Sequence, residues 1–230
     1  MSEIKNEVTK VDKKEIEVRY KVDDNEILLT PSIVQKYIVG SDAEITLPEF
    51  KFFTELCKAR KLNPFLKEAY CIKYGKNPAQ IVVGKDAIMK RAVLNPKYDG
   101  NESGIIVLTA DGEVIERKGT FKLPSERLVG GWAKVYRKDW AHETYCSVSF
   151  EEVAQRKSDG SLNSNWSSKG ATMVEKVAKV RALRETFVED LGGMYEAEEL
   201  GEEIKEEEPI IQQDEPEQTE EPKNMSLDEI

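Results

Sequence analysis

The sequence predicts an α+β fold, in which antiparallel β-structure packs against helices and an acidic tail follows. Three observations support this prediction. Residues 104–150 contain four segments rich in β-forming residues, separated by turn-forming residues. Residues 164–195 carry apolar side chains at helical spacing. Residues 201–230 are rich in Glu, Gln and Pro, a composition that cannot form a packed core.

The predicted elements follow from local signals. Thr30 before Pro31 is typical of a helix start, with threonine as the cap and proline in the first turn. Asp111-Gly112 is a two-residue turn signal that predicts a hairpin between the strands on either side. The predicted elements are helices at 30–39 and 47–61, a hairpin of strands 69–74 and 80–83, a helix at 86–94, a meander of strands at 104–109, 113–120, 128–136 and 144–150, and the helix within 164–195.

Charge divides the chain into three parts. The whole chain carries 34 Lys/Arg and 44 Asp/Glu, a net charge of −10. The last thirty residues contain twelve acids and two lysines and account for all of it, so residues 1–200 are neutral. We expect a flexible N-terminal segment (1–25), one core domain (26–200) and a disordered acidic tail (201–230).

The predicted helix in residues 164–195 is basic. Between residues 164 and 184, five Lys/Arg stand against one Glu. Arg184 lies inside the apolar stripe formed by Val180, Phe187 and Leu191. A guanidinium on an apolar face needs a partner, because an unpaired buried charge is costly. We hypothesise that Arg184 contacts a phosphate of a polyanion, and an internal salt bridge is the alternative.

Four ordered motifs resemble a known family. They are LNPFLKEAYCI (62–72), QIVVGKDAIMKRAVLNPKYDG (80–100), LVGGWAKVYRKDW (128–140) and the run from Lys176 through Arg184-Glu185-Thr186-Phe187 to Met194-Tyr195. Together they resemble the RecT/Red-beta phage recombination proteins. That resemblance implies a curved antiparallel sheet crossed by helices, assembly into a ring or helical filament, and annealing of single-stranded DNA without ATP.

The residues independently suggest how DNA would be held. Annealing needs cations on the phosphates and a few stacking side chains, while base edges stay free. The sequence is equally compatible with a bland alternative, in which each Lys or Arg is a solvated surface charge and Trp166 packs in the core. The candidate DNA-binding residues are Lys85, Lys90, Arg91, Lys97, Trp166, Lys169, Lys176, Lys179, Arg181 and Arg184.

Other classes of function are weighed against this hypothesis. Asp99, Glu116 and Lys118 fit the spacing of a magnesium-dependent nuclease, although Asp99 before Gly100 is also a turn signal. No phosphate-binding loop motif appears, which argues against an ATP-driven enzyme. One His and three Cys without paired spacing make a zinc site unexpected. We therefore expect neither catalysis nor a cofactor, and no membrane segment.

The combined expectation is a homo-oligomeric DNA-annealing protein of phage origin in the bacterial cytoplasm. Its partners would be single-stranded DNA, the annealed duplex, a partner exonuclease and the host single-strand-binding protein. We expect the acidic tail to compete with DNA for the basic surface, because it is a tethered polyanion.

Overall fold

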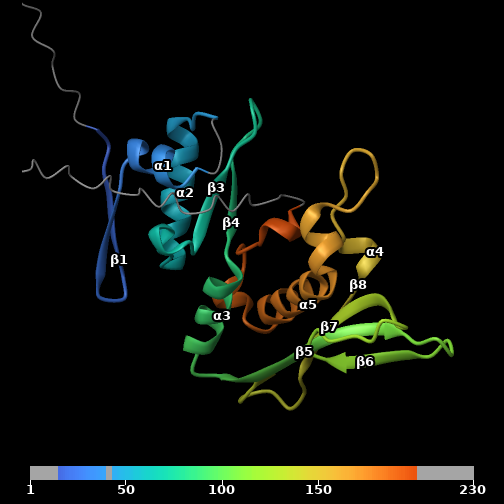
Figure 1. The fold of residues 1–230 in the computed structure, drawn as a ribbon. Coiled ribbons are helices and arrows are strands. Elements are labelled where there is room, and N and C mark those ends of the chain that lie inside the picture. Colours follow the sequence, from blue (N-terminus) through green and yellow to red (C-terminus); the bar gives the residue numbers. More distant parts are fainter. Residues whose placement is uncertain (1–14, 40–42, 201–230) are drawn as a thin grey trace, which may run out of the picture.

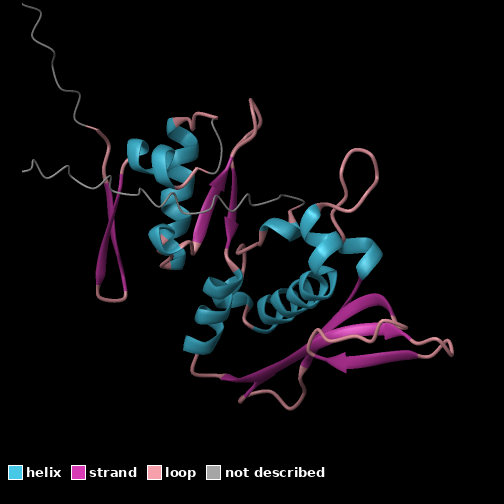
Figure 2. Cartoon of the chain, in the orientation of Figure 1, coloured by secondary structure: helices cyan, strands magenta, loops and turns pink. Residues whose placement is uncertain are grey.

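A computed structural model describes residues 15–39 and 43–200 (Figure 1). Helices pack with three separate antiparallel sheets, as Figure 2 shows by colour, and this confirms the predicted α+β class. The elements are β1 (Val18–Val22), β2 (Asn25–Leu29), α1 (Pro31–Tyr37), α2 (Leu47–Arg60), the 3-10 turn η1 (Pro64–Leu66), β3 (Ala69–Ile72), β4 (Gln80–Val83), α3 (Lys85–Leu94), β5 (Tyr98–Leu108), β6 (Val114–Lys118), β7 (Arg127–Arg137), β8 (Thr144–Ser149), α4 (Phe150–Val153), α5 (Ser164–Thr186), α6 (Val188–Leu191) and the 3-10 turn η2 (Ala197–Glu199).

The N-terminal region contains a hairpin that the sequence analysis did not predict. Strands β1 and β2 pair antiparallel, with Val18 opposite Leu29. Tyr20 is buried and donates a hydrogen bond from its hydroxyl to the carbonyl of Leu62 at 2.8 Å. The expectation of a flexible segment up to residue 25 was therefore wrong for residues 15–25. Residues 1–14, and the acidic tail at 201–230, lie outside the described residues.

Two capped helices follow the hairpin. The Thr30 side chain accepts a hydrogen bond from the backbone N–H of Ile33 at 3.3 Å, and Pro31 starts α1, which confirms the predicted cap. Thr46 and Glu49 form a reciprocal capping box at the start of α2. Each cap satisfies N–H groups that the first helical turn leaves unpaired, so these helix starts are set locally.

The four-stranded sheet differs from the predicted meander. Its order is β6-β5-β7-β8, so β7 pairs with β5 instead of with β6. Gly112 adopts a positive φ of 85° in the turn between β5 and β6, as the turn signal predicted. Strand β5 is long enough to pair with two neighbours at once, and irregularities in its register with β7 bend it.

Helix α5 lies across one face of this sheet (Figure 1). A Cβ at Gly131 of β7 would lie 2.5 Å from the carbonyl oxygen of Val174, so glycine allows helix and sheet backbones to approach closely. Buried residues from Tyr20 to Met194 form one apolar cluster that includes α5, both hairpins and the sheet. No helix among the described residues is long and apolar enough to cross a membrane.

Candidate nucleic-acid interface

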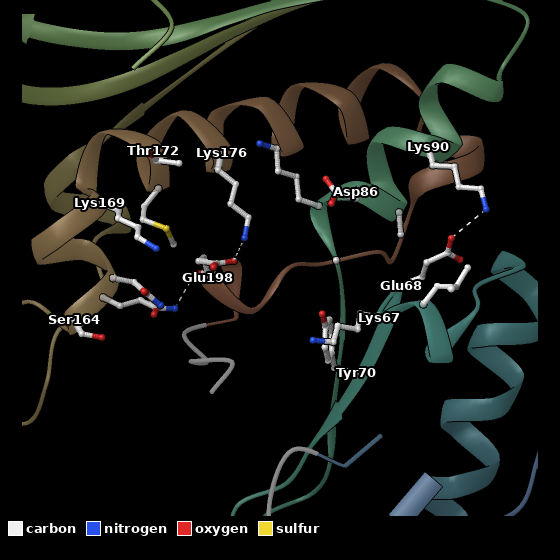
Figure 3. Close-up of a pocket in the computed structure, with 17 residues that line it drawn as sticks. Lys67, Glu68, Tyr70, Asp86, Lys90, Ser164, Lys169, Thr172, Lys176 and Glu198 are labelled. Carbon is white, nitrogen blue, oxygen red and sulfur yellow. Dashed lines mark hydrogen bonds and ion pairs between the residues drawn. The ribbon is translucent and has the colours of Figure 1, made fainter. Parts of the chain in front are cut away.

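A groove of about 960 Å³ lies between the N-terminal part of α5 and the β4–α3 junction (Figure 3). Segments far apart in the sequence form its walls: η1 with the turn after it and Tyr70, the start of α3, Gln155, the first turns of α5, and Glu198. Its lining includes five lysines and three carboxylates, a formal charge of +2. The charged lining residues are Lys67, Glu68, Lys85, Asp86, Lys90, Lys169, Lys176 and Glu198.

Three of these lysines occupy irregular backbone positions at the ends or kinks of elements. Lys67 caps the C-terminus of η1 with a left-handed φ of 58°. Lys85 is the first residue of α3, after Gly84, whose lack of a side chain leaves the first N–H groups of the helix uncapped. Lys169 has non-helical angles (φ −128°, ψ 30°) and marks a kink in α5. The three cations therefore come from three elements and all line one groove, in which Figure 3 labels Lys67 and Lys169.

The same three lysines have no carboxylate partner within the part of the chain that the structure describes. Lys67 and Lys169 are exposed and Lys85 is half-buried. Lys85 has a weaker electrostatic influence on Glu175, without a close ion pair. We call Lys67, Lys85 and Lys169 the groove lysines. Cations without a nearby counterion are the ones available to the phosphates of a strand.

The cations further along α5 are engaged inside the protein. Nζ of Lys176 lies 2.9 Å from Glu198 and 3.5 Å from Glu196. Lys179 pairs with Glu175 one turn earlier, and Glu175 also accepts a hydrogen bond from Ser103. Burial alone would raise the pKa of Glu175, but Lys179 and Ser103 outweigh burial and lower it.

Arg184 has the internal partner that the sequence analysis kept as its alternative. Its guanidinium makes a two-pronged ion pair with Glu199 and donates to the carbonyl of Met194 at 3.2 Å. It also lies over the ring of Tyr195, 4.5 Å from the centroid. Burial therefore does not require Arg184 to contact a phosphate, because Glu199 neutralises its charge.

Residues 195–200, which we call the C-terminal strap, supply most of these partners. Glu199 also lies 3.8 Å from Arg181, which is 4.0 Å from Glu152. Glu196 is buried, and burial raises the pKa of its carboxyl to about 8 despite the nearby Lys176. The backbone N–H of Val83 in β4 donates to the carbonyl of Tyr195 at 2.8 Å, which fixes the strap against the groove wall.

Three other candidates either pair with a carboxylate or lie outside the groove lining. Lys90 lines the groove but lies 3.1 Å from both Asp23 and Glu68. Lys97 lies 2.9 Å from Asp139 and does not line the groove. Arg91 is half-buried outside the groove lining and has no described ion-pair partner.

Trp166 is a correction to the predicted site. Only 1% of it is exposed, and its ring meets that of Phe150 edge-on at 5.6 Å between centroids. The helix cap Asn163 precedes it and turns the first residues of α5 toward the core. Trp166 therefore packs in the core, and a base cannot stack on it in this conformation.

The structure also separates the residues of the alternative nuclease site. Glu116 lies opposite Ile106 on β5, seven residues along that strand from Asp99, or roughly 23 Å at the usual rise per residue. Lys118 pairs with Glu102 at 2.8 Å. Two carboxylates so far apart cannot share one metal ion. Among the described residues, no group of three or more His, Cys, Asp or Glu side chains could hold one.

Lys67 is a groove residue that the sequence analysis missed. It lies three residues after Pro64, and a proline favours the end of the helix before it. A cation this close to a helix end was the available signal, because a turn between two buried elements presents its polar side chains outward. Leu66, beside it, was also missed, and this signal does not apply to an apolar side chain.

The fold and the groove define a class: an α+β protein with a groove that several elements line and whose charged side chains sum to a formal charge of +2. The model of the RecT family matches residues 29–212, which is most of the chain. The chain therefore belongs to the RecT family, and this membership implies single-stranded DNA annealing in phage-type recombination. RecT proteins are annealing proteins and are not known as enzymes. The comparison with curated proteins finds no match.

Proposed function

We propose that this chain binds single-stranded DNA in the groove between α3 and α5 and anneals it to a complementary strand without ATP. The observation that carries the proposal is that Lys67, Lys85 and Lys169, which have no described ion pair, line one groove. A strand held by its phosphates keeps its base edges available for pairing, which is what annealing requires.

Each groove element has a distinct part in this mechanism. The groove lysines neutralise phosphates, and binding releases the counterions of the strand. The start of α3 adds backbone N–H groups and the positive end of the helix dipole, beside Gly84. Asp86 and Glu198 lie in the same groove and repel phosphate, so the strand would run nearest to the lysines.

The finer features of the function rest on the sequence and the family. Independence from ATP is supported by the absence of a phosphate-binding loop motif from the sequence. We propose that the chain forms a ring or helical filament. We further propose that it receives strands from a partner exonuclease, meets the host single-strand-binding protein and acts in the bacterial cytoplasm. It would need no cofactor.

A strand-annealing assay tests the proposal. Complementary fluorescent oligonucleotides are mixed with the full chain without any nucleotide, in parallel reactions that contain either EDTA or Mg²⁺. We expect annealing faster than the spontaneous rate and no shortening of either strand. No acceleration under these conditions would contradict the proposed function, and Mg²⁺-dependent cleavage would restore the nuclease alternative.

A matched pair of variants locates the site. The triple substitution Lys67→Gln/Lys85→Gln/Lys169→Gln removes the groove lysines and should abolish annealing. Lys97→Gln removes an exposed lysine that pairs with Asp139 outside the groove, and should leave annealing near the wild-type rate. If the triple variant still annealed normally while folded, the groove would not be the site.

A further inference from the structure

The 3-10 turn η1 presents two large apolar side chains to solvent at the edge of the groove. Phe65 is 50% exposed and Leu66 is 65% exposed. Leu66 belongs to the groove lining, next to Lys67. Their neighbours Leu62 and Pro64 are buried, so the turn already has its anchors in the core and does not need these two for packing.

The turn is held rigidly in this position. The side chain of Asn63 accepts a hydrogen bond from the N–H of Phe65 at 3.0 Å, and the N–H of Lys67 donates to the carbonyl of Pro64 at 3.0 Å. The buried carboxylate of Glu68 accepts from the N–H of Asn63 at 2.7 Å. A rigid turn loses little conformational entropy when its exposed side chains meet a ligand.

The surroundings indicate what those side chains would meet. A strand whose phosphates follow the groove lysines must place its bases on one side of its backbone, within reach of the groove edge. Unstacked bases expose apolar faces, and proteins that bind single strands without sequence preference cover those faces with aromatic or aliphatic side chains. Phe65 and Leu66 directly precede Lys67, so an apolar contact and a phosphate contact lie side by side.

We propose that Phe65 and Leu66 pack against unstacked bases of the bound strand, whose phosphates lie along Lys67, Lys85 and Lys169. This inference rests on the proposed function. It assigns the base-contacting role, which the sequence analysis gave to Trp166, to a turn on the opposite side of the groove. The contact is made with base faces and leaves the pairing edges free, so it is compatible with annealing.

The test compares a normal oligonucleotide with an abasic one of the same length, which keeps the phosphates and lacks the bases. The full chain carrying Phe65→Ala/Leu66→Ala should bind the normal strand about tenfold more weakly, the size that stacking on one base contributes. Its affinity for the abasic strand should match the wild type. The slope of log affinity against log salt should also stay unchanged, because no phosphate contact is lost.

Two further variants serve as controls. Phe121→Ala/Leu123→Ala removes another exposed Phe and Leu, which lie outside the groove lining, and should bind both strands as the wild type does. Phe65→Tyr keeps a ring and should retain most of the affinity for the normal strand. Thermal denaturation verifies that each variant is folded.

Several outcomes would overturn the inference. One is wild-type affinity of Phe65→Ala/Leu66→Ala for the normal strand. Another is an equal loss on both strands, or a smaller oligomer in mass photometry, since the turn would then contact phosphate or a second copy of the chain. A wild-type chain that binds neither strand would overturn the proposed function itself, and is therefore distinguishable.

Discussion

Two groups of cations surround α5, and they differ in what neutralises them. The groove lysines have no described carboxylate within ion-pair distance, and they come from three separate elements. The cations of the C-terminal half of α5 are each held by a carboxylate, mostly from the C-terminal strap. Sequence spacing favoured the second group, because it forms a regular basic helix. The structure favours the first, because a cation that already has a partner gains less from a phosphate.

The presence or absence of a carboxylate partner also separates two roles for Lys and Arg, which are stabilising the fold and binding DNA. Arg184 and Glu199 connect the C-terminal strap to α5 in a partly buried environment, where breaking the pair leaves a carboxylate without its main partner. The groove lysines contribute little to folding, since exposed cations without partners stabilise a fold weakly. The two groups should therefore respond oppositely to substitution: one in stability, the other in DNA binding.

The largest expected effect is on stability, from Arg184→Ala. Glu199 is 5% exposed in its side chain and would lose its main partner, at a cost of about 3 kcal/mol in the free energy of unfolding. Thermal denaturation should show this as a lower melting temperature, while the folded fraction binds single-stranded DNA as the wild type does. Arg91→Ala removes an arginine that has no described ion pair and should cost less than about 1 kcal/mol. An unchanged melting temperature with lost DNA binding would reverse the comparison.

The second effect is on DNA affinity. Lys85→Gln/Lys169→Gln should weaken single-strand binding about thirtyfold, as expected for two charge-assisted contacts. The slope of log affinity against log salt should flatten by about 1.4, from about 0.7 per contact on single strands. Fluorescence anisotropy over a salt series measures both quantities.

A matched double variant tests the same comparison on Lys176 and Lys179, the two lysines of α5 that have carboxylate partners. Lys176→Gln/Lys179→Gln should change the salt slope by much less, because Glu198 and Glu175 already neutralise these lysines. If this variant flattened the slope as much as the groove variant did, the carboxylates would have to release their lysines to DNA.

The third effect is a pH dependence of stability. The folded state raises the pKa of Glu196 from 4.5 to about 8 through burial, beside Lys176, Glu198 and Glu199. The folded protein then binds more protons than the unfolded chain between these values, so stability falls as pH rises from about 4.5 to 8. Glu196→Gln should remove this pH-dependent contribution, so that the variant is more stable than the wild type above pH 8. Denaturation curves from pH 5 to 9 give the free energy of unfolding of both proteins. If it changed with pH in the same way for the variant and the wild type, the raised pKa of Glu196 would be refuted.

The smallest effect should come from Glu198→Gln. Glu198 lines the groove and holds Lys176, so removing its charge frees a cation and eliminates a repulsive carboxylate. We expect single-strand affinity to increase about threefold at low salt, the size of one screened charge interaction. The gain should disappear near 0.5 M salt, where charges are screened over a few ångströms. A decrease in affinity would show that Glu198 orders Lys176 for DNA.

Local features of the fold were predictable from the sequence, because the signals act within a few residues. The Thr30 cap and the Gly112 turn are of this kind, and both have the predicted geometry. The β1–β2 hairpin was missed because Arg19 and Lys21 alternate with its apolar residues, so the strand looked like a charged terminus. The sheet order was missed because the pairing of β5 with β7 depends on contacts over some thirty residues.

The candidate site was predictable in kind but not in detail. The sequence located cations near α3 and α5, and Lys85 and Lys169 do line the groove. It could not locate Glu199, fifteen residues after Arg184, as the partner of that arginine, since the strap has to fold back along α5 to reach it. A side chain's availability depends on long-range partners, which periodicity does not encode.

The position of the strap has one more consequence. Leu200, the last described residue, follows the groove-lining Glu198 by two positions, so residues 201–230 and their charge of −10 are attached at the groove's edge. We propose that this polyanion acts as a covalently attached counterion that competes with DNA for the groove lysines. Dissolved salt competes with DNA in proportion to its concentration, whereas a covalently attached polyanion keeps the same effective concentration at any dilution. Binding of a DNA strand would then exchange one polyanion for another. The DNA concentration needed to displace the tail would not fall when the protein is diluted.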